Sequence, residues 1–295
     1  MLIAQCGILN YFLLMIRKDK YKAFSRGCSC QLAIASIAKN EAPYLKEWIE
    51  YHKIVGVEKF YIYDNGSTDN TREVLKPYID EKTVVYKFFP GKFKQMAAYE
   101  DAIKKYKFST KWMIIMDLDE FIVPIQYDSI PDFLKDFEDC EQILINLATY
   151  GSSGHKTKPQ GLVIENYKKR GELDETSVCS CRCILNPRLV SPRSLISNRF
   201  FTFGKTVDEN KKDLGISRSF DIPCGLTARK IRGNHYYTKS LEEYFERGKK
   251  GDAYEKKCIG HRNMQLFEDL EGWTNKVYDD AIGKYTTSLE HVMKK

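Results

Sequence analysis

The sequence predicts an α/β fold with a mostly parallel sheet flanked by helices, and two observations support this. Apolar, strand-like runs alternate with amphipathic, helix-like segments between residues 30 and 117, which is typical of parallel strands joined by right-handed crossovers. The first run, CQLAIASIAKN, lacks the regular polar alternation of a half-exposed strand. We therefore expect this strand to be covered on both faces.

The first helix is expected directly after that strand, in NEAPYLKEWIEYHKIVG at residues 40–56. Pro43 suits a first helical turn, because the backbone N–H that proline lacks has no partner there. Five side chains fall on one stripe of this helix and should face the sheet. They are Leu45, Trp48, Ile49, His52 and Val55.

Further strands and helices follow in the same alternation. The aromatic and β-branched strand KFYIYD leads into the turn-rich DNGSTDN, and TREVLKPYI predicts a helix that ends at Pro77. A strand in TVVYKFF, a helix in FKQMAAYEDAIKKY and a fourth strand in WMIIMD complete the pattern. Near-helical spacing then predicts a packed, helical C-terminal segment, carried by Trp273, Val277, Ala281, Tyr285 and Leu289.

Three carboxylates directly follow the fourth strand: Asp117, Asp119 and Glu120. Burying an unpaired carboxylate is costly, so either the acids reach solvent or a positive group lies among them. Ligands of open α/β sheets bind beyond the carboxyl ends of the strands, so we expect Asp117 and Asp119 in a turn at that edge and not in the core. Two hard oxygen ligands suit Mg²⁺ or Mn²⁺ carrying a diphosphate. A solvated acidic turn is the alternative.

The charge distribution indicates the class of partner. A net charge of +7 suits an anionic partner, such as a nucleotide-linked ligand or a membrane surface. We expect no nucleic-acid partner, because the 47 Lys and Arg residues are dispersed among 40 acids. The N-terminus is apolar from Leu2 to Ile16, which is short for a bilayer span. It predicts a packed N-terminal element, with peripheral membrane contact as the alternative.

The cysteines indicate a reducing compartment. Their number, nine, is odd, which argues against a closed disulfide framework. Cys179, Cys181 and Cys183 have the spacing that places them on one face of a strand, and the C-x₂-C pairs common in zinc sites are absent. We expect buried or half-buried thiols, and hence a cytoplasmic protein that is either free or membrane-associated.

Four segments, in order, resemble glycosyltransferase family 92 and its bacterial family-2-like relatives: IASIAKNEAPYLKEWIEYHKIVGVEKFYIYDNGSTDNT, MDLDEFIVP, YGSSGHKTKPQGLVIENY and GNHYYTKSLEEYFERGKKGDA. The resemblance implies a GT-A fold, which is one Rossmann-like domain. It also implies an inverting transfer of a hexose, galactose favoured, from a UDP-linked donor to a glycan or lipopolysaccharide-type acceptor. A divalent metal, Mn²⁺ or Mg²⁺, would assist.

The resemblance also implies a division of the chain. Residues 1–29 would be an N-terminal extension and residues 30–252 the glycosyltransferase domain. Within that domain, residues 30–125 would bind the nucleotide sugar and residues 126–252 would form the acceptor side. Residues 253–295 would be the C-terminal helical segment.

Donor-side roles follow from the same resemblance. Asp64 would bind the base or ribose, because a carboxylate accepts from N–H and hydroxyl groups; a simple turn is the alternative. Glu41 is a second candidate for this pocket, or else a first-turn acid favoured by the helix dipole. Asp117 would lie near the ribose and the metal, and Asp119 would be the direct metal ligand.

The segment GNHYYTKSLEEYF carries two further candidates. His235 would complete the metal shell, or else serve as a hydrogen-bonded structural histidine. Lys239 would neutralise the leaving diphosphate, or else be solvated. Ser240 and Glu243 form a capping box, which predicts a helix start.

The acceptor side is less well defined. His155 and Glu165 lie in or after a Gly/Ser-rich loop and are candidates for contact with sugar hydroxyls. The base that takes the acceptor proton stays open among Glu165, Asp208, Glu120 and His155, and Glu120 could instead order its neighbours. Asn198 stands where family members often carry a histidine. Two other functions stay open: a nucleotidyltransferase, although SIAKNEAP is not a Gly-rich phosphate loop, and a non-catalytic sugar-binding module.

Overall fold

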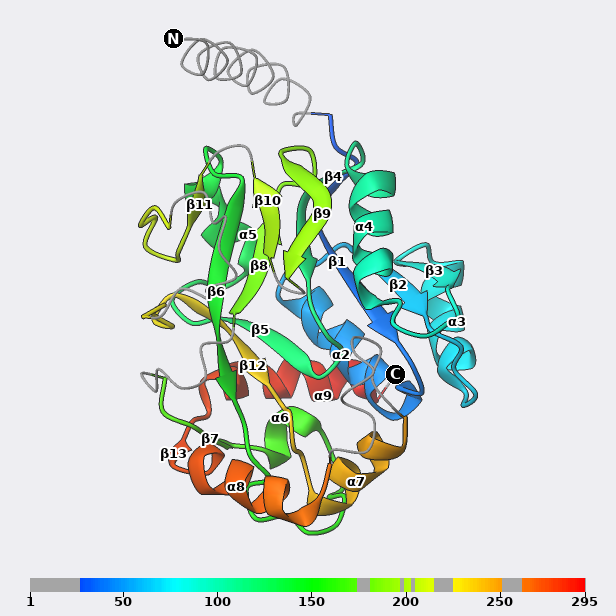
Figure 1. Cartoon of the computed structure of the whole chain (residues 1–295), viewed down its shortest axis with the longest axis vertical. Helices are drawn as coiled ribbons and strands as arrows, with labels where there is room; N and C mark the ends of the chain where they lie inside the picture. Colours follow the sequence, from blue (N-terminus) through cyan, green and yellow to red (C-terminus); the bar gives the residue numbers. More distant parts are fainter. Residues whose placement is uncertain are drawn as a thin grey trace, which may run out of the picture.

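One mixed sheet forms the centre of the protein (Figure 1). The computed structural model describes residues 27–173, 181–196, 199–202, 205–214, 225–250 and 262–294. The nine-stranded sheet has the order β3-β2-β1-β4-β8-β6-β12-β5, and β11 pairs with β6 beside this path. The strands are β1 Cys30–Ala38, β2 Lys59–Asp64, β3 Val84–Phe88, β4 Thr110–Ile115, β5 Glu120–Pro124, β6 Gln142–Thr149, β7 Lys169–Arg170, β8 Cys181–Leu185, β9 Val190–Ile196, β10 Arg199–Thr202, β11 Thr206–Val207, β12 Ile231–His235 and β13 Val277–Tyr278.

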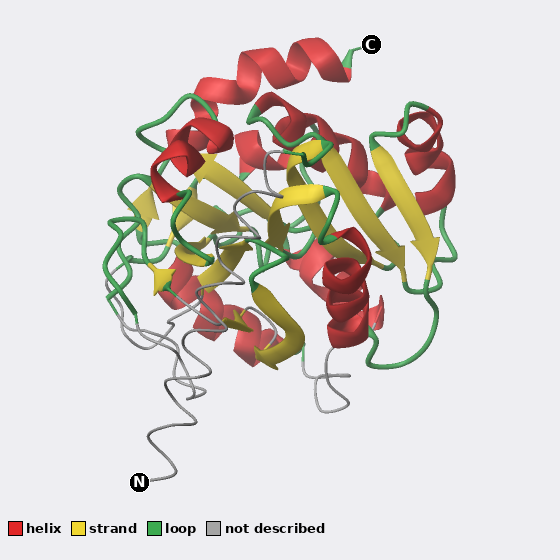
Figure 2. Ribbon diagram, turned by 90° about the horizontal axis from the view of Figure 1, so that it is seen from above, coloured by secondary structure: helices red, strands yellow, loops and turns green. Residues whose placement is uncertain are grey.

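Helices cover both faces of this sheet (Figure 2). The α-helices are α2 Ala42–Ile54, α3 Thr71–Asp80, α4 Gln95–Tyr106, α5 Ile130–Leu134, α6 Val163–Asn166, α7 Leu241–Lys250, α8 Met264–Thr274 and α9 Thr286–Met293. Two 3₁₀ helices are η1 Lys135–Phe137 and η4 Ala281–Tyr285.

The N-terminal half confirms the predicted α/β pattern. β3, β2, β1 and β4 are neighbours, and every pair among them is parallel. Helices α2 and α3 share a core with Leu32 and Ile34 on one face, whereas α4 packs with Ala33 and Ala35 on the other. Both faces of β1 are therefore buried, which explains its apolar sequence. The five stripe residues predicted for α2 are all fully buried.

The second half of the sheet turns back on the first. β8 is antiparallel to both β4 and β6, and β12 runs parallel to β6 and antiparallel to β5. Only residues 116–119 connect β4 to β5, yet four strand spacings, about 19 Å across a flat sheet, would separate the two strands. A turn this short cannot span that distance, so the sheet curls and returns β5 to the end of β4.

The prediction that the second helix ends at Pro77 is wrong, because this helix, α3, continues to Asp80. Proline removes one backbone donor from a helix. Burial of Tyr78, which is only 6% exposed, favours the continued last turn. The ion pair of Lys76 with Asp80 spans the proline but lies at the surface and contributes little.

The spacing of apolar residues predicted a helical C-terminal segment, but the structure shows that this segment is not one continuous helix. After α8, β13 pairs antiparallel with β7, and Asp279 then accepts hydrogen bonds from Arg170 Nε at 2.7 Å and Arg232 Nη2 at 2.5 Å. These largely buried ion pairs hold the segment extended. η4 and α9 follow and contribute Tyr285 and Leu289 to the main core. The division at residues 29 and 252 stays a prediction.

The expectation of buried thiols is confirmed for β8. Cys181 and Cys183 are buried free thiols on the same face of this strand, whereas Cys179 lies outside the described residues. The apolar N-terminus, Leu2 to Ile16, also lies outside them, so its predicted role is untested. Within the described ranges, no helix is both long enough and apolar enough to cross a membrane.

We expect Gly233→Ala to destabilise the curled sheet. Gly233 lies in β12 between β5 and β6, and an added Cβ would come within 2.2 Å of Leu147 Cδ2. Overpacking of this kind costs about 1–3 kcal/mol, measurable as a lower urea midpoint. Gly272→Ala in α8 is the control, since its Cβ meets no described atom within 4 Å and alanine favours a helix by up to about 1 kcal/mol. Equal midpoints for the two variants would contradict this account.

Candidate active site

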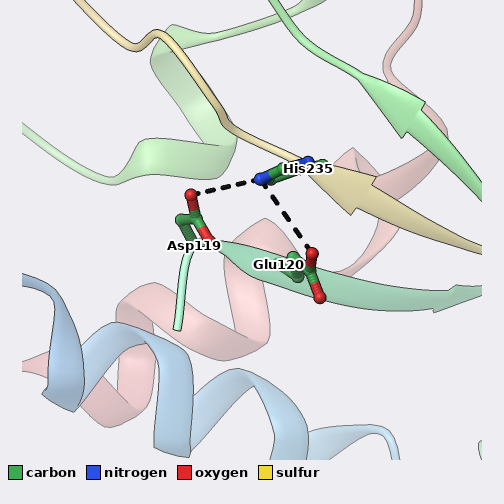
Figure 3. A group of neighbouring side chains, drawn as sticks. All are labelled: Asp119, Glu120 and His235. Carbon is green, nitrogen blue, oxygen red and sulfur yellow. Dashed lines mark hydrogen bonds and ion pairs between the residues drawn. The ribbon is translucent and has the colours of Figure 1, made fainter. Parts of the chain in front are cut away.

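The acidic turn and the end of β12 meet where the sheet curls back. Asp119 lies in the turn between β4 and β5, and Glu120 begins β5. β12 is antiparallel to β5 with His235 opposite Glu120, so the histidine is carried to the turn although it is distant in sequence. Figure 3 shows the three side chains pointing toward one another. The turn position agrees with the sequence prediction, but Asp119 and Glu120 are buried, at 6% and 0% exposure.

Asp119 is surrounded by cations, yet one of its oxygens is free. Oδ2 contacts His235 Nε2 at 3.2 Å and accepts a hydrogen bond from Arg247 of α7. Burial alone would raise the pKa of Asp119, but Arg247 and His235 hold it well below its usual range. Oδ1 is buried and has no hydrogen-bond partner among the described residues. An unpartnered carboxylate oxygen in this setting is able to accept a cation.

Glu120 is neutralised by Arg182, a residue that the sequence analysis missed. Arg182 Nε donates to Glu120 Oε2 at 2.5 Å, and its Nη2 donates to Oε1. Burial raises the pKa of Glu120 to about 7, although the Arg182 charge opposes this. Arg182 lies between Cys181 and Cys183 on β8, so the strand alternation that buries the thiols turns the guanidinium to the opposite face. The alternation of side chains along this strand was the sequence signal that could have placed Arg182 on the face opposite the thiols.

Asp117 is held by a different set of donors. Its Oδ1 accepts from Gln95 Nε2 and from the Tyr99 hydroxyl, each at 3.0 Å, and its Oδ2 accepts from Arg182 Nη2 at 2.9 Å. Both oxygens are therefore engaged, and the side chain is 29% exposed. The residues whose ligand atoms lie within 4.8 Å of one another are Asp119, Glu120 and His235, and Asp117 is not among them. Its predicted metal role stays a prediction.

Lys239 is buried rather than solvated. Its ammonium lies 3.2 Å from the centroid of the Tyr44 ring, and burial lowers its pKa to about 8, although Glu41 and Asp119 oppose the shift. The electrostatic coupling of Glu41 to Lys239 and to Arg247 places this acid beside the candidate site. Lys239 also has a left-handed backbone, with φ of 53°, which costs free energy for a non-glycine residue and is common at functional sites.

The predicted helix start at Ser240 is confirmed, and it positions Arg247. Ser240 Oγ accepts from Glu243 N at 3.2 Å, and Glu243 Oε2 accepts from Ser240 N at 3.2 Å, which together form the capping box. Tyr44 and Tyr167 also donate to the Glu243 carboxylate. The first turn of α7 is thereby fixed against α2 and the end of α6.

Asp64 ends β2, two strands away from β4 along the same carboxyl edge of the sheet. Its Oδ1 accepts from Ser67 N at 2.8 Å, and its Oδ2 accepts from the Tyr86 hydroxyl at 2.6 Å. A hollow opens beside these groups, lined by Asp64, Ser67, Asp69, Arg72, Glu73, Tyr86 and Phe88. The backbone on either side of Glu41 adjoins this hollow, because Asn40 N donates to Ser67 Oγ at 3.0 Å and Ala42 N donates to Asp69 Oδ2 at 3.2 Å. The pocket predicted for Glu41 and Asp64 together stays a prediction.

Three of the acceptor-side candidates form hydrogen bonds with the backbone, and their predicted roles stay predictions. Glu165 Oε2 accepts from Leu162 N at 3.0 Å, and His155 Nε2 lies 3.2 Å from the Asn166 carbonyl oxygen. Asp208 Oδ1 accepts from two backbone N–H groups in the turn after β11. β11 pairs with the start of β6, whereas His235 pairs with its end, so Asp208 lies well away from the acidic turn. Asn198 lies outside the described residues.

The donor set around Asp119 fits a divalent cation. A buried, unpartnered carboxylate oxygen faces a site that also contains an imidazole nitrogen and a second carboxylate. Carboxylate and imidazole ligands together suit Mn²⁺ better than Mg²⁺, which prefers oxygen ligands alone.

Comparison with known proteins places the chain in a family. Residues 32–214 match the family model for glycosyltransferase family 92. A glycosyltransferase family 92 protein of Oryza sativa subsp. japonica is 26% identical over 177 residues, which cover 58% of this chain and 30% of that protein. Galactan β-1,4-galactosyltransferase GALS2 of Arabidopsis thaliana is 31% identical over 140 residues, covering 44% of this chain and 26% of that protein. The chain therefore spans less than a third of the length of these two relatives.

A solved structure shows a weaker likeness. The crystal structure of S. aureus TarS 1–349 in complex with UDP gives a TM-score of 0.37 at 14% identity, over 54% of this chain and 47% of that chain.

We expect Arg182→Met to lower the free energy of unfolding by about 3–5 kcal/mol, because the substitution leaves the buried Glu120 charge unpaired. Adding Glu120→Gln should recover more than half of that loss in urea denaturation. Lys111→Met on the adjacent strand β4 is the control: its ion pair with Glu138 lies at the surface and should be worth at most about 1 kcal/mol. Equal losses for Arg182→Met and Lys111→Met would contradict this account.

Proposed function

Because the chain belongs to glycosyltransferase family 92, we propose that it transfers a sugar from a nucleotide sugar to a glycan acceptor. The observation that carries this proposal is the convergence of Asp119, Glu120 and His235 at the carboxyl end of a parallel strand. Ligands of α/β sheets bind at this position. A carboxylate and imidazole cluster there is able to manage the charge of a leaving diphosphate.

The donor we favour is UDP-galactose. Two relatives, GALS2 and GALS3 of Arabidopsis thaliana, are galactan β-1,4-galactosyltransferases, which supports galactose as the sugar and a β-linked glycan as the acceptor. Uridine diphosphate as the carrier follows from the resemblance of DNGSTDN to nucleotide-contact segments of GT-A enzymes. The hollow beside Asp64 offers this carboxylate to the N–H and hydroxyl groups of a nucleoside.

Asp119 and His235 are the residues we assign to a divalent metal. Asp119 would bind through Oδ1, the buried oxygen that no described residue contacts, and His235 through Nε2. The ion, when bound, would offset the negative charge that develops on the departing diphosphate. Glu120 is fully buried and held by Arg182, so we assign it to positioning the turn and not to contact with the acceptor.

The acceptor would enter beside the loop that contains His155. This loop lies against the start of α7, where Leu241 N donates to the His155 carbonyl oxygen at 3.2 Å and Glu242 N donates to that of Lys156 at 3.0 Å. The loop therefore adjoins Lys239 and the acidic turn. His155 and Glu165 remain our candidates for contact with the acceptor hydroxyl, which in an inverting transfer attacks the anomeric carbon opposite the diphosphate.

We expect Asp119→Asn to keep the fold and lose about a hundredfold in rate, since metal-based charge stabilisation is worth several kcal/mol. The measurement is UDP release from UDP-galactose with Mn²⁺ and a β-1,4-galactan acceptor. Asp128→Asn is the control, because Asp128 is an exposed acid after β5. Full activity of Asp119→Asn, or of the wild type in excess chelator, would contradict the metal role. UDP release that does not depend on any acceptor would contradict transfer to a glycan.

We expect Asp64→Asn to weaken UDP binding about tenfold, because the amide loses a charged acceptor but keeps an oxygen for Ser67 N. Calorimetry with UDP provides the measurement. Asp80→Asn, at the exposed end of α3, is the matched control. Equal UDP affinities of wild type and Asp64→Asn would place the nucleoside elsewhere.

A further inference from the structure

Two guanidinium groups share one aromatic ring beside the acidic turn. Arg262, just before α8, lies with its guanidinium carbon 4.5 Å from the centroid of the Tyr237 ring and 4.6 Å from that of Tyr244. Arg247 of α7 lies 5.6 Å from the same Tyr237 ring. Two positive charges on one ring repel each other. An anion between or beside the two groups would therefore stabilise them.

In the described part of the chain, Arg262 has fewer hydrogen-bond partners for its positive charge than Arg247 has. Its Nη1 is buried and has no hydrogen-bond partner among the described residues. Burial and the neighbouring Arg247 charge lower its pKa. Arg247, by contrast, donates to Asp119. Arg262 as a whole is half-buried, but a buried donor nitrogen is usually hydrogen-bonded. Nη1 has no such partner within the described ranges, so it points to a ligand that supplies acceptor oxygens.

The packing around Arg262 holds it in this position. Gly248 directly follows Arg247 in α7. A Cβ added at Gly248 would come 3.2 Å from Arg262 Cβ and 3.4 Å from Arg262 Cδ. The absence of a side chain lets the stem of Arg262 lie directly against the helix. Two tyrosine rings and the helix surface therefore fix the guanidinium before any ligand arrives, which lowers the entropic cost of binding.

We propose that Arg247 and Arg262, with Lys239, form a binding site for the diphosphate of the nucleotide-sugar donor. This inference rests on the proposed function, and it names the groups that would recognise the charged part of the donor. Arg247 contacts Asp119, the residue assigned to the metal, so the site adjoins the position where a metal-bound diphosphate would lie. Guanidinium groups match phosphate oxygens through two parallel hydrogen bonds.

Charges of both signs meet at this end of the site. Arg247, Arg262 and Lys239 bring three positive charges, and the acids coupled to them are Asp119, Glu41, Asp117 and Glu243. A bound divalent metal would add two positive charges, so the cations would then outnumber the acids. A diphosphate would offset that excess and supply acceptor oxygens for Arg262 Nη1.

The test is calorimetry with inorganic pyrophosphate, UDP and uridine in excess chelator, so that no metal contributes. We expect wild type to bind pyrophosphate, and to bind UDP more tightly than uridine. Arg262→Gln should weaken pyrophosphate and UDP on the order of tenfold and leave uridine unchanged. Lys249→Gln makes the same change of charge on α7 at an exposed position and should stay within about twofold of wild type.

Thermal unfolding identifies which variants are folded. If Arg262→Gln does not fold, Arg262→Lys carries the test, because lysine keeps the charge but lacks the planar fork and should bind pyrophosphate more weakly. Wild-type pyrophosphate affinity in a folded Arg262 variant, or no pyrophosphate binding by wild type, overturns the proposal. A site that binds pyrophosphate through Arg262 while no nucleotide sugar is turned over would instead contradict the proposed function and leave the anion site standing.

Discussion

The buried ion pair between Arg182 and Glu120 is the contact on which the rest of the site depends. Arg182 lies on β8 and Glu120 on β5, and β6 and β12 separate these strands in the sheet order. The pair therefore bridges the inside of the curl rather than neighbouring strands. Glu120 is 0% exposed, and a buried carboxylate needs such a partner. The curl of the sheet brings Arg182 to Glu120, and the same pair fixes the position of the acidic turn.

That pair also sets the geometry of the turn itself. Glu120 Oε2 accepts from Asp117 N at 3.1 Å, and the Asp119 carbonyl oxygen accepts from Tyr236 N at 2.9 Å. Side chain and backbone thus fix the residues on either side of Asp119, whose carboxylate is left facing His235. β12 is anchored in turn by Glu209, whose carboxylate accepts from Lys230 N and Ile231 N. The site is held by strands and their hydrogen bonds, not by a free loop.

The parts of the fold that repeat locally could be predicted from sequence, and the parts that depend on distant contacts could not. Alternating apolar runs gave the parallel half, and the Ser240 capping box gave the start of α7, since both depend on neighbouring residues. Arg182 was missed because its partners lie on other strands, and a charge between two cysteines reads as the exposed side of a strand.

The two oxygens of Asp119 have different surroundings, and this difference explains how one carboxylate can serve two cations. Oδ2 is already satisfied by Arg247 and His235, so the pKa of Asp119 stays low and the group stays ionised without a metal. Oδ1 is buried and has no partner in the part of the chain that the structure describes, so a metal at that oxygen need not displace Arg247. Arg247 then remains in place on Tyr237, beside Arg262, and the positive charge of the site increases. Such a site favours a ligand with two or more negative charges over a neutral sugar.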